Sequence, residues 1–187
     1  MEKTTKFLQK WRVRLGHLFA IIILVFARPS IETLIAGTIV AFAGEAVRVA
    51  SAGYIFKDKK LSIEGPYSFT RNPLYVGSFF MYLGFCIAAG NLIVTAAYFP
   101  FFFVVYYATI FREEAYLKGA FGAEYEKFCS EVPRFFPRLK RSASASGGGS
   151  FSFAQASKNK EYEALIAVVI ILGALWAMFL TGWHPVK

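Results

Sequence analysis

Long apolar runs separated by short polar segments dominate this sequence. The uncharged or nearly uncharged runs cover residues 15–27, about 31–53, 74–111 and 164–182. A turn signal, Gly90-Asn91, divides the third run into two arms, 74–89 and 92–111. A helix of roughly 20 apolar residues spans the hydrocarbon core of a bilayer. The pattern therefore predicts an all-α fold, a polytopic membrane bundle of about five transmembrane helices.

Two of these runs carry further expectations. The run 15–27 is short for a full span, so we expect a short first transmembrane helix and keep a re-entrant segment as the alternative. The arms 74–89 and 92–111 should form a helical hairpin, with Pro100 as a candidate kink. Both ends of a hairpin emerge on the same side of the membrane. Residues 71–72 and 112–114 should therefore be neighbours in space.

The polar segments suggest how the chain is organised around a core, 15–141. Residues 1–14 alternate basic and apolar side chains, which is typical of an interfacial amphipathic helix. Residues 112–132 predict a helix on the membrane surface, ending at Val132-Pro133. The Ser/Gly/Ala-rich stretch 142–160 reads as a flexible linker, with no packing capacity in 142–157. Residues 161–187 would then form a C-terminal transmembrane helix.

Charge adds an orientation to this picture. The chain carries 21 Lys+Arg against 12 Asp+Glu, a formal net charge of +9, and 56% of its residues are hydrophobic. The basic residues stand beside the apolar runs, which favours loops on the cytoplasmic side over a nucleic-acid partner. Placing the N-terminus and the segments 54–73 and 112–163 inside leaves Arg28 and Lys187 outside. We expect a cytoplasmic N-terminus and an external C-terminus.

A few reactive or charged residues lie in or near the apolar runs. Glu45 and Arg48 stand three apart on one face of a helix, and charges at that depth usually pair or face a cavity. A structural pair and a role at a functional site both remain open. Cys86 and Cys129 stand in dissimilar segments, so no disulfide is expected. The histidines have no neighbouring ligands at metal-site spacing, and no metal site is expected.

The stretch GPYSFTRNPLYVG at 65–77 is the best candidate for chemistry. Pro66 and Pro73 fix the backbone and predict a shaped loop that leads into a helix. Arg71 stands just before that helix, whose N-terminus carries unpaired N–H groups and a partial positive charge. Such a corner suits an anion or a zwitterion with a carboxylate. The alternative is an interface loop in which Arg71 snorkels to the membrane surface.

Three stretches carry a family resemblance: the one at 65–77, REEAYLKGAFGAEYEKFCSEVPRFFP at 112–137, and GEAVRVASAGYIFKDKKLSIE at 44–64. In these stretches the chain resembles the isoprenylcysteine carboxyl methyltransferase family and its phospholipid methyltransferase relatives. The resemblance covers roughly 44–137. It implies an integral membrane enzyme, in the bacterial inner membrane, that transfers a methyl group from S-adenosyl-L-methionine. The expected partners are membrane lipids and a lipophilic or lipidated acceptor that enters from the bilayer.

Carried over position by position, the resemblance implies a set of site residues. Expected cofactor contacts are Lys60, Leu61, Ser62, Tyr67, Arg71, Asn72, Pro73, Leu74, Tyr75 and Glu113. Expected catalytic residues are Arg112 and Glu114. The family usually has a histidine where Asn72 stands, and asparagine cannot serve as a titrating base near neutrality. Alternative functions are a phospholipid amine N-methyltransferase, a sterol-reductase-like enzyme, and a membrane protein without catalytic activity.

Overall fold

The structure, a computed structural model, describes residues 2–56, 60–142, 149–183 and 185, with side chains from residue 14 onward. Its elements in chain order are α1 (Glu2–Val25), α2 (Ile31–Ala52), the short 3-10 helix η1 (Gly65–Ser68), α3 (Pro73–Ala88), α4 (Leu92–Glu131), α5 (Phe153–Lys158) and α6 (Glu161–Thr181). No strand occurs among the described residues. The predicted all-α fold is confirmed.

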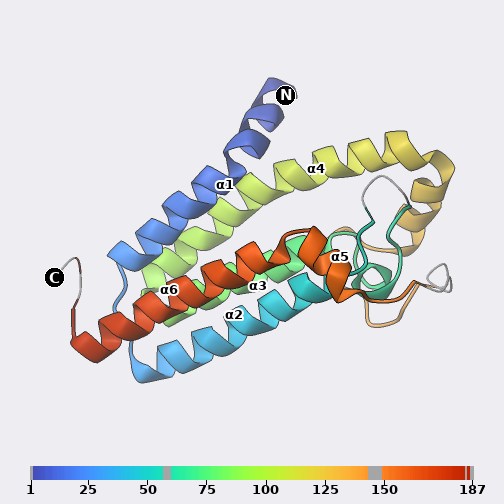
Figure 1. The fold of residues 1–187 in the computed structure, drawn as a ribbon. Helices are drawn as coiled ribbons and strands as arrows, with labels where there is room; N and C mark the ends of the chain where they lie inside the picture. The colour runs from blue at the N-terminus through green and yellow to red at the C-terminus, as the bar shows by residue number, and fades with distance from the viewer. Residues whose placement is uncertain (1, 57–59, 143–148, 184, 186–187) are drawn as a thin grey trace.

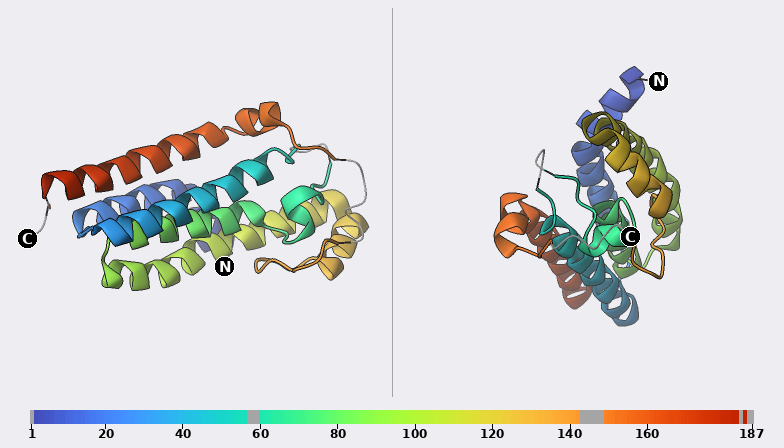
Figure 2. Two further views of the ribbon diagram at one scale, coloured as in Figure 1. Left: turned by 90° about the horizontal axis from the view of Figure 1, so that it is seen from below. Right: turned by 90° about the vertical axis from the view of Figure 1, so that its right-hand side faces the viewer.

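Five of these helices, α1, α2, α3, α4 and α6, run side by side in one bundle (Figure 1 and Figure 2). α2, α4 and α6 are long and apolar enough to cross a membrane, while Arg14–Val25 and α3 are shorter apolar helices. This identifies an integral membrane protein. Full spanning by the two shorter helices, and the orientation of the bundle, stay predictions.

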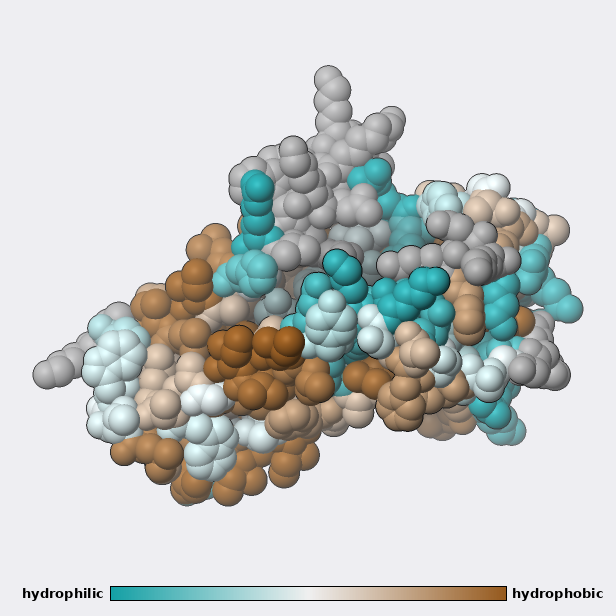
Figure 3. Space-filling model, in the orientation of Figure 1, coloured by the Kyte–Doolittle hydropathy of each residue, from teal (hydrophilic) through white to brown (hydrophobic). Residues whose placement is uncertain are grey.

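The surface shows the same division between lipid-like and polar regions. In Figure 3, hydrophobic residues cover much of the left-hand part of the molecule, and hydrophilic residues gather in the centre and at the right-hand end. The right-hand end holds η1, α5 and the end of α2 (Figure 1). Large exposed apolar side chains such as Ile39, Ile170 and Leu180 lie on the bundle helices. A surface of this kind suits contact with lipid chains.

Glycines let α2 and α3 pack with their backbones in contact. A Cβ added at Gly44 would lie 2.3 Å from the backbone nitrogen of Met81. One added at Gly84 would lie 2.3 Å from the backbone nitrogen of Ala41. Small residues at such crossings are common in membrane bundles, where close packing replaces the hydrophobic effect as the driving force. These contacts fix α3, which begins at the candidate site, against α2.

The hairpin of α3 and α4 is confirmed, with the predicted turn. Gly90 has a φ of 66°, and the Asn91 side chain accepts hydrogen bonds from the backbone nitrogens of Ile93 (3.0 Å) and Val94 (3.2 Å). Asn91 therefore caps α4. Pro73 occupies the first turn of α3, where its missing N–H costs nothing.

The expectation of a separate surface helix at 112–132 is wrong. α4 continues without interruption past residue 111, and its backbone leaves helical angles at Gly122, with φ 49° and ψ −123°. Residues after Gly122 fold back as a short arm that ends at Glu131, as expected (Figure 1). A positive φ is tolerated at glycine because it has no side chain. Pro100, the candidate kink, lies inside α4. The backbone of α4 departs from helical angles at Gly122.

The part of the expected linker that the structure describes, 149–160, packs against the bundle. The side-chain amide of Gln155 donates to the carbonyl of Ile55 (2.6 Å), and that of Asn159 donates to the carbonyl of Ala52 (2.9 Å). These bonds satisfy carbonyls at and beyond the C-terminal end of α2, which lack helical partners. Residues 143–148 of the linker, and Lys57 and Lys59 of the basic loop, lie outside the described residues.

The glycine contact between α2 and α3 gives a testable prediction. Gly44→Ala should lower stability by about 1–3 kcal/mol, because the added methyl group meets backbone rather than a side chain that can move. Gly173→Ala in α6 is the matched control, since a methyl group added there would meet nothing within 4 Å beyond its own stretch of helix. Thermal unfolding in detergent measures both. Equal midpoints for the two variants would contradict close packing of α2 on α3.

Candidate functional site

Two adjoining cavities lie at the end of the bundle where α3 begins. The larger, about 590 Å³, is lined by the loop before η1, by η1, by the start of α3 and by α4. It is lined by most of the residues expected at the site: Lys60, Leu61, Ser62, Tyr67, Arg71, Asn72, Leu74, Tyr75, Arg112 and Glu113. Segments that are far apart in the sequence thus meet around one space, as the hairpin argument predicted.

The smaller cavity, about 460 Å³, opens among the bundle helices. Its wall includes His17 of α1, Arg48 of α2, Ser78 of α3, Tyr106 of α4 and Glu161 of α6. The two cavities share six lining residues: Tyr67, Arg71, Asn72, Leu74, Tyr75 and Glu113. These six form the junction of the cavities. A ligand in one cavity would therefore meet a ligand in the other at this junction.

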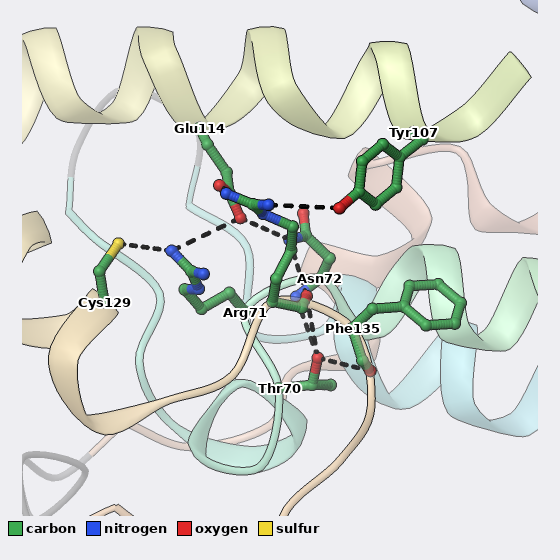
Figure 4. A network of polar contacts seen from close by, with 8 residues as sticks. Thr70, Arg71, Asn72, Tyr107, Glu114, Cys129 and Phe135 are labelled. Carbon is green, nitrogen blue, oxygen red and sulfur yellow. Dashed lines mark hydrogen bonds and ion pairs between the residues drawn. The ribbon is translucent and has the colours of Figure 1, made fainter. Parts of the chain in front are cut away.

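A buried carboxylate, Glu114, holds the loop 69–72 against α4 (Figure 4). Its Oε1 accepts a hydrogen bond from Nδ2 of Asn72 (3.2 Å) and lies 3.6 Å from NH1 of Arg71. Its Oε2 accepts from Nε of Arg134 at 2.9 Å. Only 9% of the Glu114 side chain is exposed, so two guanidinium groups and an amide compensate a charge largely removed from water.

Arg134 is itself fixed from the other side. Its guanidinium carbon lies 4.3 Å from the centre of the Phe111 ring, and NH1 contacts the hydroxyl of Tyr107 at 3.4 Å. Guanidinium groups stack favourably on aromatic rings. The backbone carbonyl of Arg134 also accepts from Nδ2 of Asn72 at 3.0 Å. Both amide hydrogens of Asn72 are thus used within the protein.

The segment 133–142 runs along the loop and completes it. The backbone nitrogen of Arg71 donates to the carbonyl of Pro133 (2.9 Å), and that of Arg138 donates to the carbonyl of Phe69 (2.9 Å). The hydroxyl of Thr70 donates to the carbonyl of Phe135 at 3.0 Å. These bonds supply partners to a loop that has no regular secondary structure of its own. The loop 69–72, which follows η1, is therefore a fixed wall of both cavities.

Glu113, next to Glu114 on α4, faces the junction of the cavities rather than the clamp. Its Oε2 accepts a hydrogen bond from the hydroxyl of Tyr75 at 2.7 Å, in an exposed position at the junction. Burial, and then the nearby charge of Glu113, raise the pKa of Tyr67 well above its usual value. Tyr67 therefore stays neutral at the junction, and Glu113 is the acidic group that a ligand can reach.

Ten of the twelve expected site residues line the larger cavity, and two do not. Pro73 is fully buried as the first residue of α3 and does not line the cavity. Glu114 lies behind the wall in the clamp just described, so the geometry does not support direct catalysis by Glu114. The expected roles of all twelve stay predictions.

The sequence reasoning missed several residues at the site. Tyr116, Phe121 and Phe128 add an aromatic side to the larger cavity, and Cys129 Sγ lies 2.7 Å from NH1 of Arg71. Arg134 braces Glu114. Val132-Pro133-Arg134 belongs to a stretch that carries the family resemblance, but the sequence does not show that Arg134 pairs with Glu114. The aromatic side depends on the fold of α4 around Gly122, which the sequence pattern did not reveal.

The pairing of Glu45 with Arg48 is confirmed and has a third member. Nε of Arg48 lies 3.6 Å from Oε2 of Glu45 and 2.7 Å from Oε1 of Glu161, the first residue of α6. NH1 of Arg48 donates to the hydroxyl of Ser78 on α3. The cluster thus ties α2, α3 and α6 together beside the smaller cavity.

Comparison with known proteins identifies a family and related chains. The family model of phospholipid methyltransferases matches residues 30–124, just over half of the 187 residues. The chain is 39% identical over 83 residues to the cobalt-zinc-cadmium resistance protein CzcN of Cupriavidus metallidurans. It is 36% identical over 81 residues to the protein-S-isoprenylcysteine O-methyltransferase of Schizosaccharomyces pombe.

These matches are partial on both sides. They include 44% and 43% of this chain, and 38% and 34% of CzcN and of the Schizosaccharomyces pombe protein. The chain therefore spans little more than a third of the curated relatives that it matches. No solved structure matches the chain. The matched region 30–124 contains α2, η1, α3 and most of α4, and hence most of the wall of the larger cavity.

The two adjacent glutamates should behave differently when neutralised. Glu114→Gln should lower stability by about 3–5 kcal/mol, because it removes the buried carboxylate that compensates the partly buried guanidinium groups of Arg71 and Arg134. Glu113→Gln is the matched control, since Glu113 is exposed and lies outside the clamp. Thermal and chemical unfolding in detergent compare them. A Glu114→Gln protein as stable as Glu113→Gln would show that the clamp does not support the fold.

Proposed function

Because the chain belongs to the phospholipid methyltransferase family, we propose that it is an integral membrane methyltransferase that uses S-adenosyl-L-methionine to methylate a lipophilic acceptor. The observation that carries this proposal is the junction of the two cavities. The larger cavity opens among polar loops, and the smaller one opens among bundle helices. Cofactor and acceptor would each have a separate space, and their reactive ends would meet at the junction.

The residues of the larger cavity fit the chemistry of the cofactor. Its volume of about 590 Å³ falls within the range of roughly 300–1,000 Å³ typical of ligand sites. Arg71 offers a guanidinium for the methionine carboxylate, and its Nε is buried without a hydrogen-bond partner. Glu113 offers a carboxylate for the ammonium group or a ribose hydroxyl. The aromatic side at Tyr116 and Phe121 suits the flat adenine ring.

A cofactor held by Arg71 and Glu113 would supply an electrophilic methyl group on a sulfonium, and sulfur would be the leaving group when an acceptor lone pair takes the methyl group. The protein's own contribution is orientation. Proximity and alignment of two reactants supply much of the rate enhancement in such displacements. The fixed loop 69–72 and Tyr75, bonded to Glu113, hold the wall where the reactants meet.

We favour an acceptor whose nucleophile is already charged, as in isoprenylcysteine-type carboxyl methylation. Asn72 cannot take a proton, and both of its amide hydrogens bond to Glu114 and Arg134. Arg112 lines the larger cavity and could orient an anionic acceptor. The match to the family of phospholipid methyltransferases supports the alternative, an amine of a phospholipid headgroup. Glu113 would then be the carboxylate available to receive the proton.

The proposed setting is the inner membrane of a bacterium, with the N-terminus, the site and the end of α4 on the cytoplasmic side. The distribution of Lys and Arg supports this orientation. The similarity to CzcN of Cupriavidus metallidurans supports a bacterial membrane. A cytoplasmic site would have direct access to the soluble cofactor.

Neutralising Glu113 should weaken cofactor binding. Glu113→Gln removes a charge-assisted contact worth roughly 1.5–3 kcal/mol, which corresponds to about a ten- to hundredfold loss of affinity. Calorimetric titration of S-adenosylhomocysteine into the purified protein in detergent measures it. Glu126→Gln is the matched control, because Glu126 lies on the exposed arm after Gly122 and pairs with Lys118 on the surface.

Three results bear on the proposal. The wild type should bind S-adenosylhomocysteine, Glu113→Gln should bind it more weakly, and Glu126→Gln should bind it as the wild type does. This result supports a cofactor site in the larger cavity. Equal binding by all three proteins places the cofactor elsewhere. Absence of binding to a folded wild-type protein contradicts the methyltransferase proposal and favours a non-catalytic membrane protein or a sterol-reductase-like enzyme.

The pH dependence of methyl transfer should separate the two acceptor classes. An amine with a pKa of about 10, like that of lysine, must lose a proton, so its methylation should rise roughly tenfold per pH unit below that value. A carboxylate, with a pKa of about 4, is ionised throughout and should show a flat profile from about pH 6 to 9. Transfer of a labelled methyl group to each acceptor class measures this. A steep rise would contradict the carboxylate acceptor that we favour.

A further inference from the structure

Arg48 is a guanidinium placed inside the bundle at the wall of the smaller cavity. It lies one turn before the end of α2, and Glu45, Glu161 and Ser78 surround it from α2, α6 and α3. A charge at this depth is costly unless it is paired or used. Two carboxylates for one guanidinium is more compensation than a structural pair requires. The cluster therefore retains a partner for Arg48 even if one carboxylate is displaced.

Within this cluster the guanidinium is the group most accessible from the cavity. The Arg48 side chain is 20% exposed, whereas those of Glu45 and Glu161 are 3% and 7% exposed. Both carboxylate oxygens of Glu45, Oε1 of Glu161 and Nε of Arg48 between them are enclosed by protein. The exposed part of the cluster therefore belongs mostly to the rest of the Arg48 side chain. A ligand that enters the smaller cavity meets a positive group.

Arg48 lies close to the point where the two cavities join. It donates to Ser78, and the hydroxyl of Ser78 in turn donates to the carbonyl of Leu74 at 2.9 Å, one helical turn earlier. Leu74 is one of the six shared lining residues. One turn of a helix rises about 5.4 Å. A group bound at Arg48 would thus lie only a short way from the junction.

We propose that Arg48 is an acceptor-positioning residue that binds an anionic group of the lipophilic acceptor, in exchange for its ion pair with Glu161. The inference rests on the proposed function for the identity of the ligand as the acceptor. Glu45 keeps Arg48 paired during the exchange, because it stays on the same helix three residues away. Guanidinium groups bind carboxylate and phosphate through charge-assisted hydrogen bonds.

The exchange also gives α6 a role in acceptor choice. Glu161 begins α6, which lies outside the region that the family model matches. Lys160, Glu163, Ala164 and Ala167 from the same stretch line the smaller cavity. The proposed acceptor site is therefore completed by α6, a helix outside the region that the family model matches. Its charge at residue 161 competes with the ligand for Arg48.

The test uses the chain of residues 1–187 purified in a neutral maltoside detergent, with dodecyl phosphate as the probe. Binding is followed by the shift of the thermal unfolding midpoint on titration, and S-adenosylhomocysteine affinity is measured in parallel. Arg48→Gln should weaken dodecyl phosphate binding about tenfold or more. Glu161→Gln should strengthen it several-fold, because it removes the competing carboxylate. Arg141→Gln, which removes an exposed arginine outside both cavities, is the matched control.

The opposite responses of Arg48→Gln and Glu161→Gln are the expected signature. Equal probe binding by wild type and Arg48→Gln, or weaker binding by Glu161→Gln, would overturn the proposal. If Arg48→Gln does not fold, Glu161→Gln alone decides, since Glu45 still compensates Arg48 in that variant. Inorganic phosphate should leave the thermal unfolding midpoint unchanged. If inorganic phosphate bound as tightly as dodecyl phosphate, that result would rule out a lipophilic acceptor.

The parallel titration separates this inference from the proposed function. A protein that fails to bind S-adenosylhomocysteine contradicts the methyltransferase, whatever its response to dodecyl phosphate. In another outcome, wild type and Arg48→Gln bind S-adenosylhomocysteine with equal affinity and also bind dodecyl phosphate with equal affinity. That result contradicts only the role of Arg48.

Discussion

The buried carboxylate of Glu114 is the interaction on which the site depends. It comes from α4, and its partners come from the loop before α3 and from the segment after α4. A charge removed from water requires such partners, and removing one would leave the others uncompensated. Glu114 therefore holds α4, the loop before α3 and the segment after α4 in one arrangement, although these three belong to no common helix. The walls of both cavities follow from that arrangement.

The same constraint divides two neighbouring glutamates between structure and chemistry. Successive residues of a helix point about 100° apart, since a turn takes 3.6 residues. Glu114 consequently faces the clamp, while Glu113 faces the junction and bonds to Tyr75. The clamp also uses both amide hydrogens of Asn72. The polar groups that line the cavities outside the clamp include Arg71, Glu113, the tyrosines of the junction and, in the smaller cavity, Arg48.

Much of this site could be predicted from the sequence because a hairpin has a simple geometry. An uncharged run with a Gly-Asn turn at its middle brings residues 71–72 and 113–114 together, and the structure does so. Glu114, expected at the catalytic centre, lies in the clamp behind the cavity wall, because the direction of each glutamate depends on the exact phase of α4. The long course of α4 was missed because nothing in its charged part ends the helix before Gly122.

Contacts between distant segments were beyond the sequence pattern. Glu161 reaches Arg48 across 113 positions, and the linker composition of 142–160 gave no sign that Gln155 and Asn159 would bond to the end of α2. Such bonds depend on where α6 returns along the bundle. Local periodicity carries no information about that return, whereas it does specify which faces of α3 and α4 are apolar.

Hydrogen–deuterium exchange of the full chain in detergent, with and without S-adenosylhomocysteine, tests the central claim most directly. The account predicts slower exchange for backbone amides of the loop 60–72 and of α4 around 112–121, which line the larger cavity. Amides around 159–167, at the smaller cavity, should change little. No protection in the loop, or protection confined to α6, would contradict a cofactor site built on the Glu114 clamp.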